Sequence, residues 1–231
     1  MQKKKKVAIF DVDGTIFRSS LLIEVTEALI EEGIFPEKVK KIYAKSFNAW
    51  LNRTDSYDEY IMDVVKAFEK NIVDVKQTDF ARVVKKVIAL HKNKVYRYTR
   101  DLVKELKKKH YFLLAISHSP RELVYQFCKN LGFDKVYARI YEVGEVGTFT
   151  GNTLHVDLIS NKANILRRFI EKENLSLADS FGVGDSESDI NFLTFVDNPI
   201  CFNPNSKLYA HAKKAGWGVV VERKDVIYKI N

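Results

Sequence analysis

The chain contains 231 residues, of which 46% are hydrophobic, so it is long enough for one large core or for a core with a smaller attached unit. No apolar stretch reaches the length of a membrane span, and the apolar run after the N-terminal lysines is too short for a signal peptide, so we expect a cytoplasmic protein without membrane partners. The net charge of +8 suits anionic substrates, but nucleic acid is not an expected partner, because most lysines lie on polar helix faces and no zinc-ligand spacing is present.

The first predicted element is a short buried strand from Val7 to Asp11, followed closely by a second aspartate, Asp13. Side chains two apart on an extended segment point the same way and lie roughly 7 Å apart, so the two carboxylates face one point. Such a pair repels itself and costs free energy unless a cation lies nearby. The pair is therefore the first candidate functional feature.

Four amphipathic helices are predicted next, with no strand between them. Apolar residues repeat at helical spacing from Leu21 to Leu29, from Pro36 to Leu51, from Ser56 to Phe68 and from about Asp79 to His91. Pro36 is suited to a first helical position, and Ser56 with Glu59 has the spacing of a capping box. Helices in succession bury their apolar stripes against one another, so we expect a small bundle.

After about residue 98 the pattern changes to strands alternating with helices. Strands are predicted at 111–117, 134–138, 180–184, 199–202 and 217–221, a hairpin at 141–154, and helices at 120–131, 161–173 and 188–196. Ser119 is expected as the N-cap of the first of these helices, with Glu122 as its capping-box partner. The alternation predicts an α/β fold: a Rossmann-like parallel-sheet core of residues 1–17 and 98–231, with an inserted all-helical cap of residues 18–97.

Polar side chains follow several of these strands. Asp11 and Asp13 follow the first strand, Ser117 ends the second, and Asp185 follows the strand in "SFGVG", with Asp189 four residues later. In open α/β sheets, ligands bind beyond the carboxyl ends of the strands, so we expect these groups to converge. Lys162 opens a helix, where a cation is unfavourable to the helix dipole and needs a compensating partner.

These motifs resemble, in their order, those of the haloacid dehalogenase-like hydrolase superfamily, in its phosphoserine-phosphatase-like branch. The matching motifs are "DVDGT", "ISHS", Lys162 and "GDSESD", and the helical insertion lies where that branch carries its cap. The resemblance implies a phosphatase, because dehalogenases and phosphonatases lack an acid at the position of Asp13.

The resemblance also implies roles for the motif residues. Asp11 would be the nucleophile that forms an aspartyl-phosphate, and Asp13 the general acid and then the base. Mg²⁺ would be held by Asp11, the main-chain carbonyl of Asp13 and Asp185, with Asp189 in support. Ser117, the N–H groups after it and Lys162 would hold the phosphoryl oxygens of a small phosphomonoester substrate.

Some positions depart from the family pattern. The second motif reads Ser117-His118-Ser119 instead of serine followed by two glycines, and His118 is a candidate for substrate contact. The position of the substrate-reading glutamate is Ser20, and the arginine of the cap aligns near Val64. A substrate other than phosphoserine is therefore expected. Arg18, just after the first motif, is a further residue that could face the cleft.

Two other functions fit parts of the pattern. A non-catalytic protein on the same scaffold could use its basic surface to hold a polyanion or nucleic acid, and the same chemistry could transfer the phosphoryl group to an acceptor other than water. A non-catalytic binding protein would not need Asp13 and Lys162, whereas the enzyme needs both.

Cys128 and Cys201 are expected as buried thiols, consistent with a reducing compartment. The sequence carries no indication of oligomeric state.

Overall fold

The computed structural model describes residues 4–155 and 162–230, and the chain divides into two compact units. We call them the sheet unit (residues 1–18, 93–139 and 155–231) and the helical unit (residues 19–92 and 140–154). Within the described part of the chain, no helix has the length and apolar composition needed to cross a membrane.

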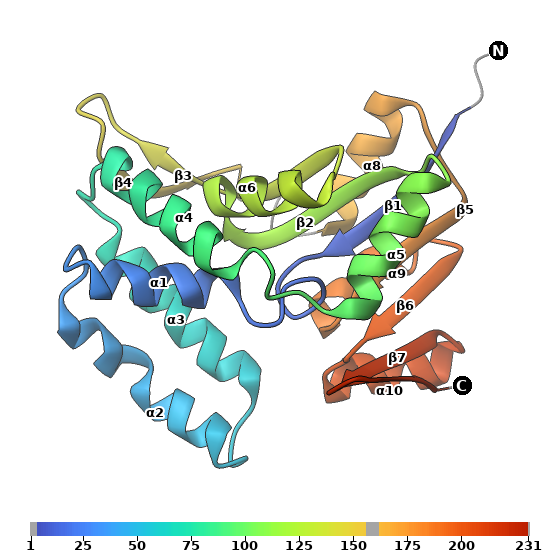
Figure 1. The fold of residues 1–231 in the computed structure, drawn as a ribbon, viewed down its shortest axis with the longest axis horizontal. Coiled ribbons are helices and arrows are strands. Elements are labelled where there is room, and N and C mark those ends of the chain that lie inside the picture. The colour runs from blue at the N-terminus through green and yellow to red at the C-terminus, as the bar shows by residue number, and fades with distance from the viewer. Residues whose placement is uncertain (1–3, 156–161, 231) are drawn as a thin grey trace. The chain divides into compact units, whose positions relative to one another are not determined.

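The sheet unit is built around a mostly parallel sheet (Figure 1). Its strands are β1 (Lys5–Asp11), β2 (Phe112–Pro120), β3 (Lys135–Val143), β5 (Leu175–Gly184), β6 (Asn198–Phe202), β7 (Gly218–Arg223) and β8 (Val226–Ile230). Their order is β3-β2-β1-β5-β6-β7-β8, and the pairings are parallel except for the last, in which β8 runs antiparallel to β7. The α/β Rossmann-like core is thus confirmed, with β1 in the interior of the sheet, paired on both sides.

Helices cover both faces of this sheet. They are α5 (Arg97–Lys108), α6 (Arg121–Leu131), α8 (Lys162–Glu173), α9 (Ile190–Leu193, after the 3₁₀ turn η2, Glu187–Asp189) and α10 (Ser206–Ala215). Val7 and Ile9 of β1 share one buried cluster with residues of α8, α9 and α10. The alternate side chain Phe10 packs edge-on against Phe133, which follows α6. Alternate residues of β1 therefore serve two cores, as a doubly covered parallel strand requires.

The helical unit contains the four expected helices, α1 (Leu21–Glu31), α2 (Lys40–Leu51), α3 (Tyr57–Asn71) and α4 (Gln77–His91). The second begins later than predicted, because the residues after Pro36 form a 3₁₀ turn, η1 (Glu37–Val39). The Ser20 and Ser56 side chains cap α1 and α3 by accepting from the N–H groups of Leu22 and Glu59. Both caps satisfy donors that a helix start leaves unpaired.

The predicted hairpin forms from the end of β3 and from β4 (Phe149–Leu154), but it groups with the helices. Phe149 exchanges backbone hydrogen bonds with the turn before α4, accepting from Asp74 N–H and donating to the Val75 carbonyl. Its ring packs edge-on against Phe80 of α4 at 5.3 Å between centroids. The helical unit therefore includes a β-hairpin, whereas the sequence places residues 141–154 in the core and ends the cap at residue 97.

Three further expectations differ from the structure. Helix α6 starts at Arg121, with Pro120 as its N-cap and no side-chain cap, so the predicted capping box of Ser119 and Glu122 is wrong. The helix expected at 188–196 is only the short pair η2 and α9. Strand β8 was not predicted, although its sequence VIYKI consists mostly of residues that favour strands.

Candidate active site

The loop after β1 brings the first two aspartates to the edge of the sheet. Asp11 is the last residue of β1 and is 6% exposed. The chain then turns tightly, with the N–H groups of Ile16 and Phe17 both donating to the Val12 carbonyl. Gly14 has a φ of +78°, and a Cβ there would lie 2.1 Å from Asp185 Oδ2. Only glycine fits this turn, which packs directly against a carboxylate delivered by β5.

Lys162, the first residue of α8, lies between two buried carboxylates. Its ammonium nitrogen is 2.6 Å from Asp11 Oδ1 and 2.6 Å from Asp189 Oδ1, and its side chain is 3% exposed. These carboxylates are the compensating partners that a cation at a helix start requires. Burial opposes the charge on Lys162, but the two aspartates outweigh it and raise the pKa of the lysine above its ordinary value.

Asp189 organises the loop after β5. Its Oδ2 accepts from the backbone N–H groups of Asp185 (3.0 Å) and Ser186 (3.1 Å), while Oδ1 holds Lys162. A Cβ at Gly184 would lie 2.5 Å from Asp189 Oδ2, so this close approach requires glycine. Both oxygens of Asp189 are thus engaged. This geometry suits a residue that positions Asp185 and Lys162.

The carboxylates of Asp11, Asp185 and Asp189 form a compact acidic group, with one oxygen of each within 4.8 Å of the others. Burial, and then the neighbouring aspartates, raise the pKa of Asp11 to about 7 against the lowering effect of Lys162. Burial and the same neighbours raise the pKa of Asp185 well above its usual range. Asp11 Oδ2 is buried without a hydrogen-bond partner among the described residues. A cluster with one cation and an orphaned buried oxygen can accept a divalent cation, which prefers carboxylate oxygens.

Two serines of β2 point at Asp13. The hydroxyls of Ser117 and Ser119 both donate to Asp13 Oδ2, at 2.7 and 2.8 Å, and the Ser117 oxygen accepts from the Ser119 N–H. Both serines are buried. Sequence reasoning assigned Ser119 to helix capping and so missed it as a site residue. The signal available was its spacing of two from Ser117, which places both on one side of a strand.

His118 lies between these serines and is partly exposed. Strand alternation turns its side chain to the other side of β2 from the two hydroxyls that meet Asp13. The structure thus brings together Asp11, Lys162, Asp185 and Asp189, and separately Asp13 with Ser117. A phosphate contact by His118 stays a prediction that this alternation does not favour.

Comparison with known proteins identifies the family. The family model of the haloacid dehalogenase-like hydrolases matches residues 8–194, which include every candidate site residue. The chain belongs to this family. A phosphoserine phosphatase of Methanocaldococcus jannaschii is 27% identical to this haloacid dehalogenase-like hydrolase over 203 residues, 87% of each chain. A histidinol-phosphatase of Neisseria meningitidis is 24% identical over 226 residues, 94% of this chain and 98% of the relative.

Solved structures agree with this haloacid dehalogenase-like fold. A Bordetella pertussis protein of unknown function superposes with a TM-score of 0.73 at 15% identity, covering 94% of this chain and 98% of that one. A phosphoserine phosphatase solved as a phospho-aspartyl intermediate analogue has a TM-score of 0.63 at 24% identity, covering 96% of each chain. The family match and the phosphatases among the relatives support the predicted phosphatase, and the solved structures agree with its fold.

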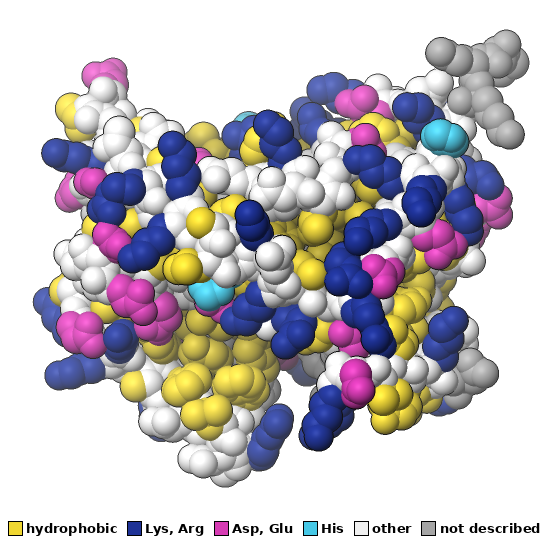
Figure 2. All heavy atoms as spheres, in the orientation of Figure 1, with side chains coloured by type: hydrophobic (Ala, Val, Ile, Leu, Met, Phe, Trp, Pro, Cys, Tyr) yellow, Lys and Arg dark blue, Asp and Glu magenta, His cyan; other side chains and the backbone are white. Residues whose placement is uncertain are grey.

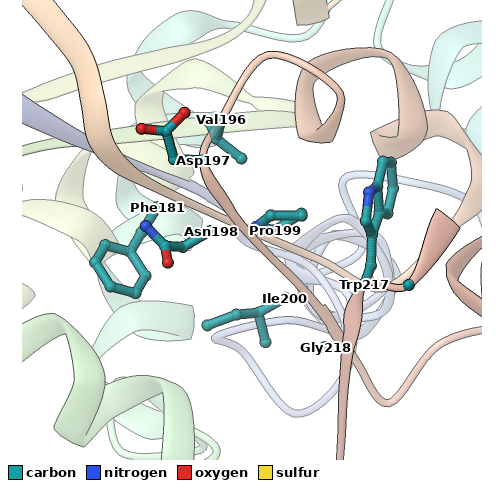
Figure 3. A pocket seen from close by; sticks show the side chains of 9 residues that line it. Phe181, Val196, Asp197, Asn198, Pro199, Ile200, Trp217 and Gly218 are labelled. Carbon is teal, nitrogen blue, oxygen red and sulfur yellow. The ribbon is translucent and has the colours of Figure 1, made fainter. Parts of the chain in front are cut away.

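A surface cavity of about 510 Å³ in the sheet unit holds none of the candidate site residues (Figure 3). Its walls include Asp197, Asn198, Pro199 and Trp217, at the starts of β6 and β7. The aspartates, by contrast, lie at the ends of β1 and β5. Ligands of parallel α/β sheets bind beyond the carboxyl ends of the strands, and this cavity lies at the opposite ends, so it is not part of the candidate active site.

Proposed function

We propose that this hydrolase is a Mg²⁺-dependent phosphomonoesterase that acts through an aspartyl-phosphate on Asp11. The observation that carries the proposal is the state of the Asp11 carboxylate: Oδ1 is held by Lys162 at 2.6 Å, and Oδ2 is buried with no hydrogen-bond partner in the described part of the chain. A carboxylate fixed by one oxygen and free at the other is suited to attack phosphorus, or to ligate a cation.

In the first chemical step, an Asp11 oxygen forms a bond to phosphorus while the bond to the ester oxygen breaks. Asp13 gives its proton to the departing alcohol and becomes a carboxylate. In the second step, a water oxygen bonds to phosphorus, its proton goes to Asp13, and the bond from Asp11 to phosphorus breaks. Phosphate leaves, and both aspartates return to their initial state.

Asp11, Asp185 and the main-chain carbonyl of Asp13 would hold Mg²⁺, with Asp189 orienting the loop of Asp185. Hard oxygen ligands and a deficit of positive charge suit this ion. When bound, the ion would supply positive charge that offsets the carboxylates and the phosphoryl oxygens.

We assign Ser117 and Lys162 to the phosphoryl oxygens. Lys162 has three N–H donors, of which two are directed at Asp11 and Asp189, so one is left for a phosphoryl oxygen. The lysine also favours the ionised form of Asp11, because it opposes the rise in the pKa of Asp11 that burial and Asp189 cause.

The substrate we propose is a small phosphorylated metabolite other than phosphoserine. The Ser20 hydroxyl, at the position of the family's substrate-reading glutamate, is buried and accepts from Leu22 N–H as a helix cap. Val64, near which the family's arginine aligns, is 1% exposed in the helical unit. Neither supplies the charge that reads an amino acid.

Both cysteines support the proposed cytoplasmic location. Cys128 and Cys201 are buried, free thiols, and burial raises the pKa of Cys201 to about 12. Free thiols are usual in reducing compartments.

The test is phosphate release from a generic aryl phosphate by the purified protein. We expect turnover with Mg²⁺, loss of turnover with a chelator, and a fall of at least about 1,000-fold in Asp11→Asn, because the amide is no nucleophile. The matched control is Asp101→Asn, which alters an exposed aspartate paired with Arg100 and should leave the rate unchanged. Turnover that survives in Asp11→Asn would refute the assignment.

A further inference from the structure

The hydroxyls of Ser117 and Ser119 both donate to Asp13 Oδ2, but only one of these hydrogen bonds can remain when Ser117 binds phosphate. A hydroxyl has one proton to donate. In this structure the Ser117 proton goes to Asp13 Oδ2, yet the proposed function requires it at a phosphoryl oxygen. The Ser119 hydroxyl, 2.8 Å from the same oxygen, has no such second task.

Ser119 is buried at a fixed point of the backbone, so its hydroxyl can hold the Asp13 carboxylate in one orientation. It is 3% exposed at the end of β2, where Pro120 and Arg121 start α6. Its N–H donates to the Ser117 oxygen at 2.9 Å, so one residue orients both the phosphate-binding hydroxyl and the Asp13 carboxylate. Because helix α6 begins without a side-chain cap, nothing in the described cap geometry competes for the Ser119 hydroxyl.

We propose that Ser119 is a positioning residue for acid–base catalysis: its hydroxyl holds Asp13 Oδ2 so that the other oxygen, Oδ1, carries the proton given to the leaving alcohol. When the Ser117 proton goes to a phosphoryl oxygen, the Ser119 O–H still points at Asp13 Oδ2, so the proton of the neutral acid lies on Oδ1. The inference rests on the proposed function.

The experiment separates proton delivery from the rest of catalysis by varying the leaving group. The substrates are p-nitrophenyl phosphate and phenyl phosphate, which are similar in size. Nitrophenolate leaves readily without a proton, whereas phenolate is much more basic and needs one. In Ser119→Ala, kcat/KM for phenyl phosphate should fall by about 10- to 100-fold, and kcat/KM for p-nitrophenyl phosphate by no more than about threefold.

Three comparisons make the result decisive. Ser206→Ala, an exposed serine at the start of α10, is the matched control and should not change either rate. The ratio of the two rates within one sample does not depend on how much of the variant is folded, so partial misfolding does not mask the effect. Asp13→Asn should show the same selective loss more strongly.

An equal loss on both substrates in Ser119→Ala, or no loss on either, would overturn the role of Ser119 while leaving the phosphatase assignment standing. Absence of turnover by the unaltered protein on both esters would overturn the proposed function and this inference with it.

Discussion

Removal of the Lys162 charge should destabilise the fold strongly, because Lys162 is a buried cation between two buried carboxylates. Lys162→Met keeps the length of the side chain and removes the charge, leaving Asp11 and Asp189 uncompensated. We expect a loss of about 3–5 kcal/mol in the free energy of unfolding, measured by urea denaturation without Mg²⁺. Lys109→Met, which breaks an exposed ion pair with Glu105, is the control and should change nothing measurable. Equal effects of the two variants would contradict the prediction.

Glu32 is a second residue with a testable charge, this time in the helical unit. Hydrogen bonds from Lys86 and Arg82 lower its pKa to about 2. A carboxyl whose pKa is lower in the folded state stabilises the fold above its unfolded value of about 4.5 and loses that effect as the pH falls toward 2.

Glu32→Gln should therefore lower the melting temperature at pH 7 and make little difference near pH 2, as measured by circular dichroism. Glu31→Gln, at the neighbouring exposed position, is the control and should show no such pH dependence. A constant difference between the Glu32→Gln variant and the unaltered protein at all pH values would contradict the ion-pair explanation.

At the level of residues, the sequence could predict which aspartates end strands and that Lys162 needs an acidic partner. It could not predict the partner. Asp11 and Asp189 are 178 positions apart along the chain, and only the register of β1 with β5 brings them to one lysine. Ser119 was assigned to a helix cap because its spacing from Glu122 fitted a capping box. Its contact with Asp13 joins residues far apart in the chain, and local spacing does not reveal such a contact.

Among the elements, the hairpin of β3 and β4 is an unexpected part of the helical unit, and its anchor is Phe149. The Phe149 side chain is 1% exposed and packs on Phe80. Phe149→Ala should cost about 3–5 kcal/mol of unfolding free energy, from lost burial and the cavity left behind. Val146→Ala, at the hairpin turn with 86% of its surface exposed, is the control and should have little effect. Urea denaturation followed by Trp fluorescence measures the unfolding free energy of both variants. Equal unfolding free energies of the two variants would show that the hairpin does not stabilise the helices.

Helices with strong apolar periodicity were predictable to within a few residues, as α3 and α4 show. Short elements were not. Helix α9 has four residues, too few to show a period, and β8 is an exposed edge strand. The hairpin itself was predicted from Gly147 and Gly151, both with positive φ, but not the helices against which it packs, because that depends on Phe80 and Phe149 meeting in space.

On the scale of the whole molecule, the charge follows the expectation of solvated faces. In the view of Figure 2, Lys and Arg side chains are spread over the surface with Asp and Glu between them. Helix α5 illustrates this: Thr99, Val103 and Leu106 are buried, and its last turn carries Lys107 and Lys108 on the polar side. The net charge of +8 thus needs no polyanion partner to account for it.

The chain enters the helical unit twice, once at residue 19 and again at residue 140. During synthesis, the helices of the first visit emerge long before the hairpin that covers Phe68 and Phe80. Those aromatic side chains stay exposed to water, to chaperones and to neighbouring nascent chains until β3 and β4, which follow β2 and α6 in the chain, have been made. Folding of the helical unit therefore cannot finish before part of the sheet has been synthesised. A ribosome that stalls before residue 140 leaves a helical bundle with exposed aromatic side chains that is prone to aggregate.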